Sequence, residues 1–243
     1  MKYKMNIMNK KELEDELGRF DSKKYIEENT VQVVRKMYEE GKSVGDIELC
    51  ALFVAMVSWG QKKNMIEAAY RMMDMCDWKP LEFICLGDFY DIPDDEVIYR
   101  TVKGKEFKQV CHKLREFYNK RGSVRNVLLS NPETTVDDIL IAISRWCEEI
   151  KFGSPLNNSA CKRICLLLRW MIRKDSVDIG LWQVGNVKPE NLYAVIDSVS
   201  VRAASESGLI SYPKESWKAV QELTYIYKSW DHKDPLKYDL LKF

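Results

Sequence analysis

The chain has little that would suit a membrane, a secretory route or a histidine-rich metal centre. None of its apolar runs approaches the ~18 residues of a membrane span, and the longest, residues 49–59, suits a buried helix. The N-terminus reads Met-Lys-Tyr-Lys-Met-Asn and lacks the apolar segment of a signal peptide, so we expect no secretory leader. The two histidines, His112 and His232, are too few for a metal centre built on imidazole.

Other motifs for cofactors are also missing. The seven cysteines are scattered through apolar stretches, where they would pack as small hydrophobic residues. This usage and their odd number are typical of a reducing cytoplasm and predict no disulfide framework. Cys161 and Cys165 would share one helix face without a further Cys or His nearby, and no four-cysteine iron–sulfur pattern follows Cys165. The chain has no Gly-x-x-x-x-Gly-Lys-Ser/Thr loop. We therefore expect a cytoplasmic protein without a metal or a nucleotide cofactor.

Charge is nearly balanced over the whole chain, with a formal net charge of +1, and gives no global argument for a nucleic-acid partner. Basic residues nevertheless gather locally. Residues 101–126 hold eight Lys or Arg against two Glu, and residues 161–174 hold five against none. Such stretches are compatible with a DNA footprint, but solvated helix faces would explain them equally well.

The hydrophobic pattern is helical almost throughout. Apolar side chains recur three and four residues apart, and no β-branched run alternates with a period of two over a useful length. The pattern predicts an all-α protein of ten to twelve helices with little or no sheet. The clearest helices are expected at residues 44–59, 62–75, 107–118, 136–150, 162–173 and 214–230.

Two charged residues stand beside predicted core. Lys162 opens the apolar helix 162–173, and Asp197 lies within the apolar segment 192–202. A charge next to a core must be paired, solvated at an edge, or functional. The bland alternatives are that Lys162 caps a surface turn and that Asp197 is a helix N-cap.

The order of turn, lysine, helix and aspartate resembles the helix-hairpin-helix DNA glycosylase superfamily, whose closest named enzymes are the 8-oxoguanine glycosylase/lyases. Ser58-Trp-Gly-Gln61, Asp175 after the lysine helix, Gly180-Leu-Trp182 and Asp234-Pro-Leu-Lys-Tyr-Asp239 are similar to an uncharacterised bacterial family placed as a distant member of that superfamily. The resemblance runs from about residue 44 to residue 243.

The resemblance implies an all-α, helix-hairpin-helix glycosylase-like domain over residues 1–243, with two helical lobes and a cleft between them. One lobe would span about residues 60–153, and the other residues 20–59 plus 154–243. It also implies that Lys162 is a nucleophile that forms a Schiff base with a sugar. Asp197 would stabilise positive charge on that sugar and move protons. The expected activity is removal of a damaged purine such as 8-oxoguanine from duplex DNA, with β-lyase activity.

Further residues are assigned on the same resemblance. Packing and capping roles are the open alternative for the base-pocket residues, and the turn at residues 155–159 lacks the usual glycines, although Asn tolerates left-handed backbone. The candidates for binding an extruded base are Trp59, Gln61, Asp234 and Tyr238. The candidates for contacting the DNA backbone are Asn157, Asn158, Ser159, Arg163 and Arg202.

One segment departs from the family pattern. The family often has Pro-Leu-Asp-x-His-Val around the aspartate, whereas this chain has Val195-Ile-Asp-Ser-Val-Ser200. The missing proline and histidine support an alternative function, a non-catalytic helical module that binds nucleic acid or protein on a degenerate glycosylase scaffold.

Overall fold

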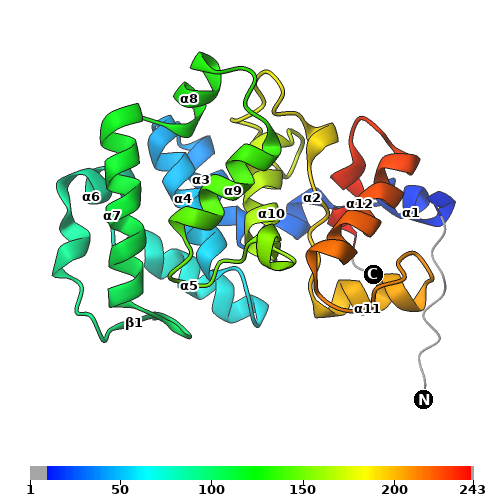
Figure 1. Ribbon diagram of the computed structural model, residues 1–243, viewed down its shortest axis with the longest axis horizontal. Helices are drawn as coiled ribbons and strands as arrows, with labels where there is room; N and C mark the ends of the chain where they lie inside the picture. Colours follow the sequence, from blue (N-terminus) through cyan, green and yellow to red (C-terminus); the bar gives the residue numbers. More distant parts are fainter. Residues whose placement is uncertain (1–9, 242–243) are drawn as a thin grey trace.

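The computed structural model describes residues 10–241, and this part of the chain is mostly helical, as the sequence predicts. The described residues form twelve α-helices, shown in Figure 1. Their bounds are α1 Lys10–Leu17, α2 Ser22–Glu27, α3 Val31–Glu39, α4 Val44–Val57, α5 Lys62–Asp74, α6 Pro80–Leu86, α7 Gly104–Arg121, α8 Val124–Ser130, α9 Val136–Trp146, α10 Lys162–Ile172, α11 Ser198–Glu206 and α12 Trp217–Trp230. Four short 3₁₀ helices are η1 Asp88–Asp91, η2 Pro155–Asn157, η3 Pro189–Asn191 and η4 Pro235–Leu240.

Extended structure is limited to a small hairpin in this part of the chain. Strands β1 (Val97–Tyr99) and β2 (Val102–Lys103) pair antiparallel, and two isolated bridges lie elsewhere. Arg100, at the hairpin tip, has a positive φ of 54°. Tyr99 docks the hairpin on the end of α4, because its hydroxyl donates to the Trp59 carbonyl at 2.7 Å.

Helix α4 is the centre of the core. Its residues from 47 to 57 are all buried, which matches its apolar composition on every face. It packs against α3, α5, α6, α8 and α10. It therefore contacts helices from both of the lobes that the resemblance implies, and the division into lobes stays a prediction.

The two ends of the molecule are built from different parts of the chain. Helices α6 and α7 lie at one end in Figure 1, whereas α1, α11 and α12 lie at the other. The 3₁₀ helix η4 packs against α12 and α1, so the last described residues close against the first. Helix α10 packs on α4 and α9.

A buried carboxylate ties three separate segments to α4. Glu48 is 1% exposed and accepts hydrogen bonds from the Tyr118 hydroxyl, the Val124 and Arg125 amides and the Trp182 indole. Burial raises the pKa of Glu48, and these four donors oppose the rise. Two of the donors are backbone amides at the start of α8, which a helix leaves unsatisfied without a cap.

No helix among residues 10–241 is both long enough and apolar enough to cross a bilayer. Residues 1–9, on which the expectation of no secretory leader rests, lie outside the described part of the chain.

Candidate functional site

Lys162 is the first residue of α10, directly after a tight turn. Cys161 precedes it with a left-handed backbone (φ 49°), and Asn158 is also left-handed (φ 54°) after η2. The asparagine thus makes the turn that a glycine would otherwise make. This path directs the chain into α10 with Lys162 at its N-terminal end.

Asp197 is both an N-cap and the partner of Lys162. One carboxylate oxygen, Oδ1, accepts from the amides of Val199 at 3.1 Å and Ser200 at 3.0 Å at the start of α11. The other, Oδ2, accepts from Lys162 Nζ at 2.8 Å, although the two residues are 35 positions apart. The two oxygens divide the roles, so the capping function does not exclude the ion pair.

The ion pair is partly open to solvent. The Lys162 and Asp197 side chains are 30% and 37% exposed. Burial raises the pKa of Asp197, but the Lys162 ammonium and the bonds from Ser200 outweigh it, so the pKa lies below its usual value. Asp197 is therefore a charged carboxylate at neutral pH.

Both side chains line a pocket of about 430 Å³, which we call the lysine pocket. This volume falls within the roughly 300–1,000 Å³ of small-molecule sites. Its polar wall includes the hydroxyls of Thr30 and Ser58, which share a hydrogen bond of 2.8 Å. The pocket is lined by Tyr25, Asn29, Thr30, Ser58, Gly60, Lys62, Met65, Lys162, Leu166, Arg169, Val195, Asp197, Val199, Ser200, Leu223, Tyr227, Asp239, Leu240 and Leu241.

Asp239 is a pocket residue that the sequence analysis missed. Its Oδ2 accepts from the Val195 amide at 2.8 Å, two residues before Asp197, so it holds the segment that carries the candidate carboxylate. Burial raises the pKa of Asp239 to about 7, against the pull of Arg169. The available signal was its place at the end of the Asp234–Asp239 motif.

The two other residues proposed from that motif do not line the pocket. Asp234 is bound by Arg173 through two hydrogen bonds of 2.7 and 2.9 Å. Tyr238 is fully buried against Tyr227 and Trp230. Asp234 thus pairs at the start of η4 without capping it through its side chain, and Tyr238 packs within η4, which corresponds to the packing alternative.

Trp59 and Gln61 lie beside the lysine pocket without lining it. Their neighbours Ser58 and Gly60 form the wall instead. Trp59 packs edge-on against Tyr99, with ring centroids 5.8 Å apart. Gln61 is exposed and precedes α5 without making a side-chain cap.

The turn before α10 is attached to α12. The Asn158 carbonyl accepts from the Trp217 amide at 3.1 Å, and its side-chain oxygen accepts from the Lys218 amide at 3.3 Å. Ser159 Oγ accepts from the Cys161 amide at 3.3 Å, whereas Asn157 is exposed. Asn157 and Asn158 are therefore the exposed members of the three turn residues proposed to contact DNA.

The two arginines proposed for the DNA backbone differ in environment. Arg163 donates to the carbonyls of Met56 and Lys151 and lies 4.6 Å from the Phe152 ring centroid. Burial lowers the pKa of Arg163 to about 10, which leaves it charged at neutral pH. Arg202 is exposed on α11 and lies apart from the lysine pocket.

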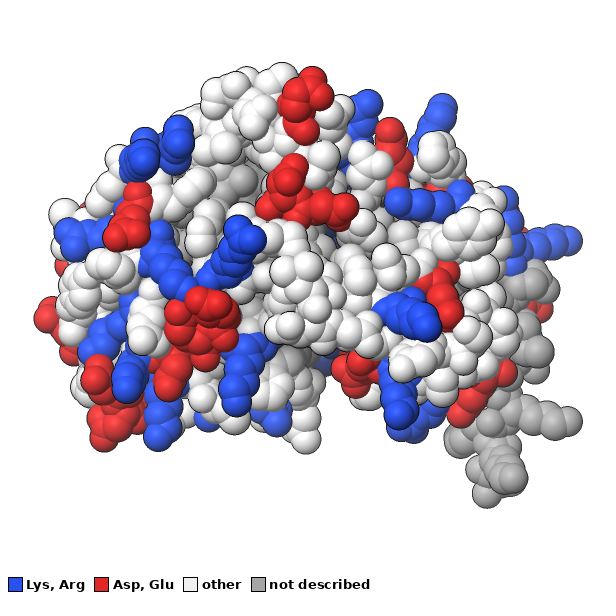
Figure 2. Space-filling view, viewed as in Figure 1, with Lys and Arg blue, Asp and Glu red and all other residues white. Residues whose placement is uncertain are grey.

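The basic stretches are partly neutralised by carboxylates. In residues 161–174, Arg169 and Arg173 are buried and both pair with Asp178, so the stretch is not a continuous basic face. On α7, Lys108 pairs with Asp94, and Lys113 pairs with two glutamates of the 147–150 segment. Figure 2 shows Lys and Arg interleaved with Asp and Glu over this end of the molecule.

The described residues contain no group of three or more His, Cys, Asp or Glu placed to hold a metal ion. Fold and pocket together define a mostly helical protein with a lysine–carboxylate pair at an open pocket. A family model described as "Protein of unknown function (DUF2400)" matches residues 32–242, and the chain belongs to this family. Neither curated proteins nor solved structures gave a match.

Proposed function

We propose that the protein is a DNA base-excision glycosylase with β-lyase activity, which removes a damaged purine such as 8-oxoguanine. The observation that carries the proposal is the 2.8 Å contact between Lys162 Nζ and Asp197 Oδ2 at the wall of an open pocket. An amine nucleophile needs a base to take its proton and a carboxylate to balance charge on the sugar. Asp197 is within reach for both.

The first step replaces the base with the protein. Asp197 takes a proton from Lys162, and the free amine attacks C1′ of the deoxyribose. The bond between C1′ and the base nitrogen breaks, and its electron pair leaves with the base. The protonated Asp197 returns the proton to the departing base, which balances the charge.

The second step opens the sugar. The attached Lys162 nitrogen loses a proton, the C1′–O4′ bond breaks, and O4′ takes up a proton, which leaves a C1′=N iminium. Removal of a C2′ proton then expels the 3′ phosphate with the electron pair of the C3′–O bond. The carboxylate of Asp197 stabilises the cationic sugar on this path.

The lining of the lysine pocket and the state of the cysteines support the proposed substrate and the proposed cytoplasmic location. The lysine pocket combines apolar and aromatic residues with polar and charged ones, and a base taken out of the stack is bound by stacking and hydrogen bonds of this kind. The partner would be damaged duplex DNA. All seven cysteines, which lie within the described residues, are free, in keeping with a cytoplasmic location.

A second candidate function is a helical module that binds nucleic acid or protein without chemistry. The ion pair favours it in one respect, because Lys162 and Asp197 join the starts of α10 and α11 and thus have a structural role. The segment from Val195 to Ser200 also lacks the proline and histidine of the family pattern.

Borohydride trapping on duplex DNA with one 8-oxoguanine distinguishes the two functions. Hydride reduces a C1′=N iminium to a stable amine, so the wild type should form a covalent protein–DNA adduct and the Lys162→Gln variant should form none. The matched control is Lys120→Gln, since Lys120 is exposed at the far end of α7. If the wild type binds DNA but gives no adduct with any damaged purine, the non-catalytic module is the better account.

A further inference from the structure

The indole of Trp59 holds two guanidinium groups beside the lysine pocket. Arg100 lies over the ring at 4.2 Å from guanidinium carbon to ring centroid, and Arg163 lies at 5.7 Å. Arg100 comes from the tip of the β1–β2 hairpin, and Arg163 from the second position of α10. Two distant parts of the chain thus place like charges on one aromatic ring.

Neither arginine pairs with a carboxylate in residues 10–241. Arg163 donates its hydrogen bonds to backbone carbonyls, and the exposed Arg100 stacks on the Trp59 ring. The cations that line the pocket differ in this respect. Lys162 pairs with Asp197, Arg169 with Asp178, and Lys62 with Glu28.

Arg100 also lies close to Gly60. Its guanidinium packs against the bare Cα of Gly60, where a Cβ would lie 2.4 Å from Nη1. Gly60 lines the lysine pocket, so the arginine stands at its edge. A guanidinium stacked on an aromatic ring keeps its N–H edges free for two parallel bonds to an oxyanion.

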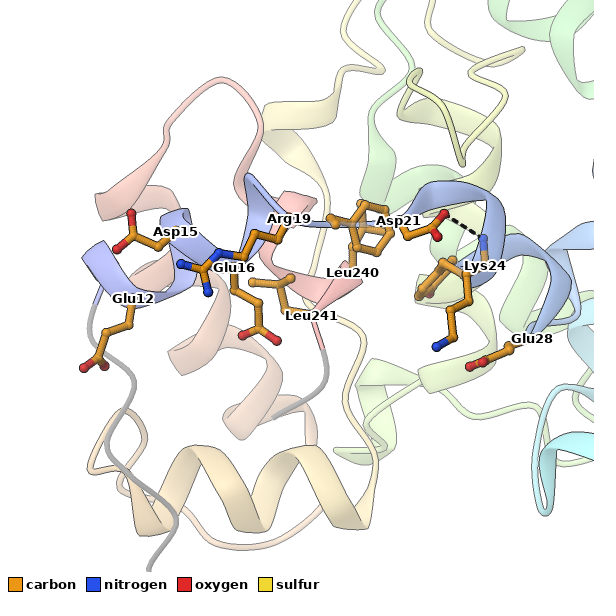
Figure 3. Close-up of a pocket in the computed structure, with 11 residues that line it drawn as sticks. Glu12, Asp15, Glu16, Arg19, Asp21, Lys24, Glu28, Leu240 and Leu241 are labelled. Carbon is orange, nitrogen blue, oxygen red and sulfur yellow. Dashed lines mark hydrogen bonds between the residues drawn. The ribbon is translucent and has the colours of Figure 1, made fainter.

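A neighbouring pocket carries more acidic than basic residues. This second pocket of about 700 Å³, the acidic pocket, shares Tyr25, Leu240 and Leu241 with the lysine pocket. Figure 3 shows this pocket between α1, α2 and the segment with Leu240 and Leu241. Its charged lining residues are five acidic against two basic: Glu12, Asp15, Glu16, Asp21 and Glu28, with Arg19 and Lys24. A phosphate would be repelled there and attracted at Arg100.

We propose that Arg100, stacked on Trp59 next to Arg163, binds a backbone phosphate of the DNA strand whose nucleotide enters the lysine pocket. The inference rests on the proposed function, and it adds the direction from which the strand approaches. The phosphate contact is made by the β1–β2 hairpin and not by α1 or α2.

The test measures binding of a duplex that carries a tetrahydrofuran abasic-site analogue, by fluorescence anisotropy at several salt concentrations. Loss of one phosphate contact should weaken binding about fivefold to tenfold at 0.1 M salt and lower the slope of log K against log salt by about 0.9. Arg100→Ala should show both changes, and Arg100→Lys should keep the slope but bind more weakly, because an ammonium does not stack in the same way.

Arg145→Ala is the control, an exposed arginine on α9 away from the lysine pocket. The proposal is overturned if Arg100→Ala matches Arg145→Ala in affinity and slope while the wild type binds and forms the borohydride adduct. If the wild type binds no DNA at low salt, this inference and the proposed function both fall. The two failures are therefore distinguishable.

Discussion

Arg173 and Asp234 meet through two parallel hydrogen bonds, Nε to Oδ1 at 2.7 Å and Nη2 to Oδ2 at 2.9 Å. The side chain of Arg173 is 6% exposed and also contacts Asp175 and Asp178, so three carboxylates surround one guanidinium. This network joins the end of α10 to the start of η4, and η4 carries the segment that ends at Asp239. The lysine pocket therefore depends on a salt-bridge network outside its own wall.

Arg173→Ala should destabilise the fold by up to about 3–5 kcal/mol, because it removes a buried cation shared by three carboxylates and leaves the buried Asp178 with Arg169 alone. Urea unfolding followed by circular dichroism measures the change. Lys63→Ala is the control, since the Lys63–Glu67 pair is exposed and should contribute well under about 1 kcal/mol. Equal midpoints for the two variants would show that the network contributes nothing to stability.

Asp197→Asn should slow base release by about 10²–10³ and leave the fold intact. The amide removes the charge that balances a cationic sugar, whereas Asn remains a good N-cap for α11. Single-turnover kinetics on damaged duplex DNA measures the rate. Asp21→Asn is matched to it, because Asp21 caps α2 away from the lysine pocket. A wild-type rate for Asp197→Asn would assign the ion pair to structure alone.

Asp239 should make stability depend on pH in an unusual direction. Its pKa rises from 3.8 to about 7 on folding, so the folded chain binds the proton more tightly, and stability falls as pH rises from about 4 to about 7. Asp239→Asn should remove this loss and can still accept from the Val195 amide. The pKa difference sets an upper limit of about 4 kcal/mol, which partial exposure reduces to on the order of 2 kcal/mol above pH 7.

Unfolding free energies of the wild type and Asp239→Asn between pH 4 and 8 provide the measurement. Asp231→Asn should change in the opposite direction, because hydrogen bonding from Lys237 lowers the pKa of Asp231 and the stabilisation is present above about pH 4. Parallel curves for Asp239→Asn and the wild type would contradict the assignment.

Cys85 should be the first cysteine to react with a thiol reagent in the native protein. It is the one cysteine of the seven, all of them described, that is not buried. Burial also raises the pKa values of Cys76 and Cys161, to about 12 and about 11, so few thiolates form there at pH 8. Peptide mapping after brief maleimide labelling shows the order, and rapid labelling of Cys161 would mean that the turn before α10 opens.

Local pattern was enough to predict the helices and the place of the candidate pair. The expected helix at residues 162–173 is observed at Lys162–Ile172, and the one at 136–150 at Val136–Trp146. Apolar spacing is set within a few turns, so it can be read without knowing the fold. The N-cap alternative for Asp197 is observed, and the same carboxylate also pairs with Lys162, because each of its oxygens accepts separately.

Local apolar spacing could not predict which residues of distant segments pair with each other. A count of charges in residues 161–174 could not show that Arg169 and Arg173 turn inward to Asp178 and Asp234. The motif from Asp234 to Asp239 offered two aspartates, and tertiary packing decides which one lines the pocket. Asp234 meets Arg173, and Asp239 meets the Val195 amide.

The ion pair between Lys162 and Asp197 also attaches α11 to α10. Asp197 starts α11, which buries only Val201, Ala203 and Ala204 against the rest of the described chain. Any bond that Lys162 forms with another molecule withdraws its ammonium from Asp197, and α11 then keeps its cap but loses its tie to α10. Amide hydrogen exchange in α11 should therefore be faster when Lys162 is bound to another molecule. The exchange rate of α11 thus measures whether the lysine pocket is occupied.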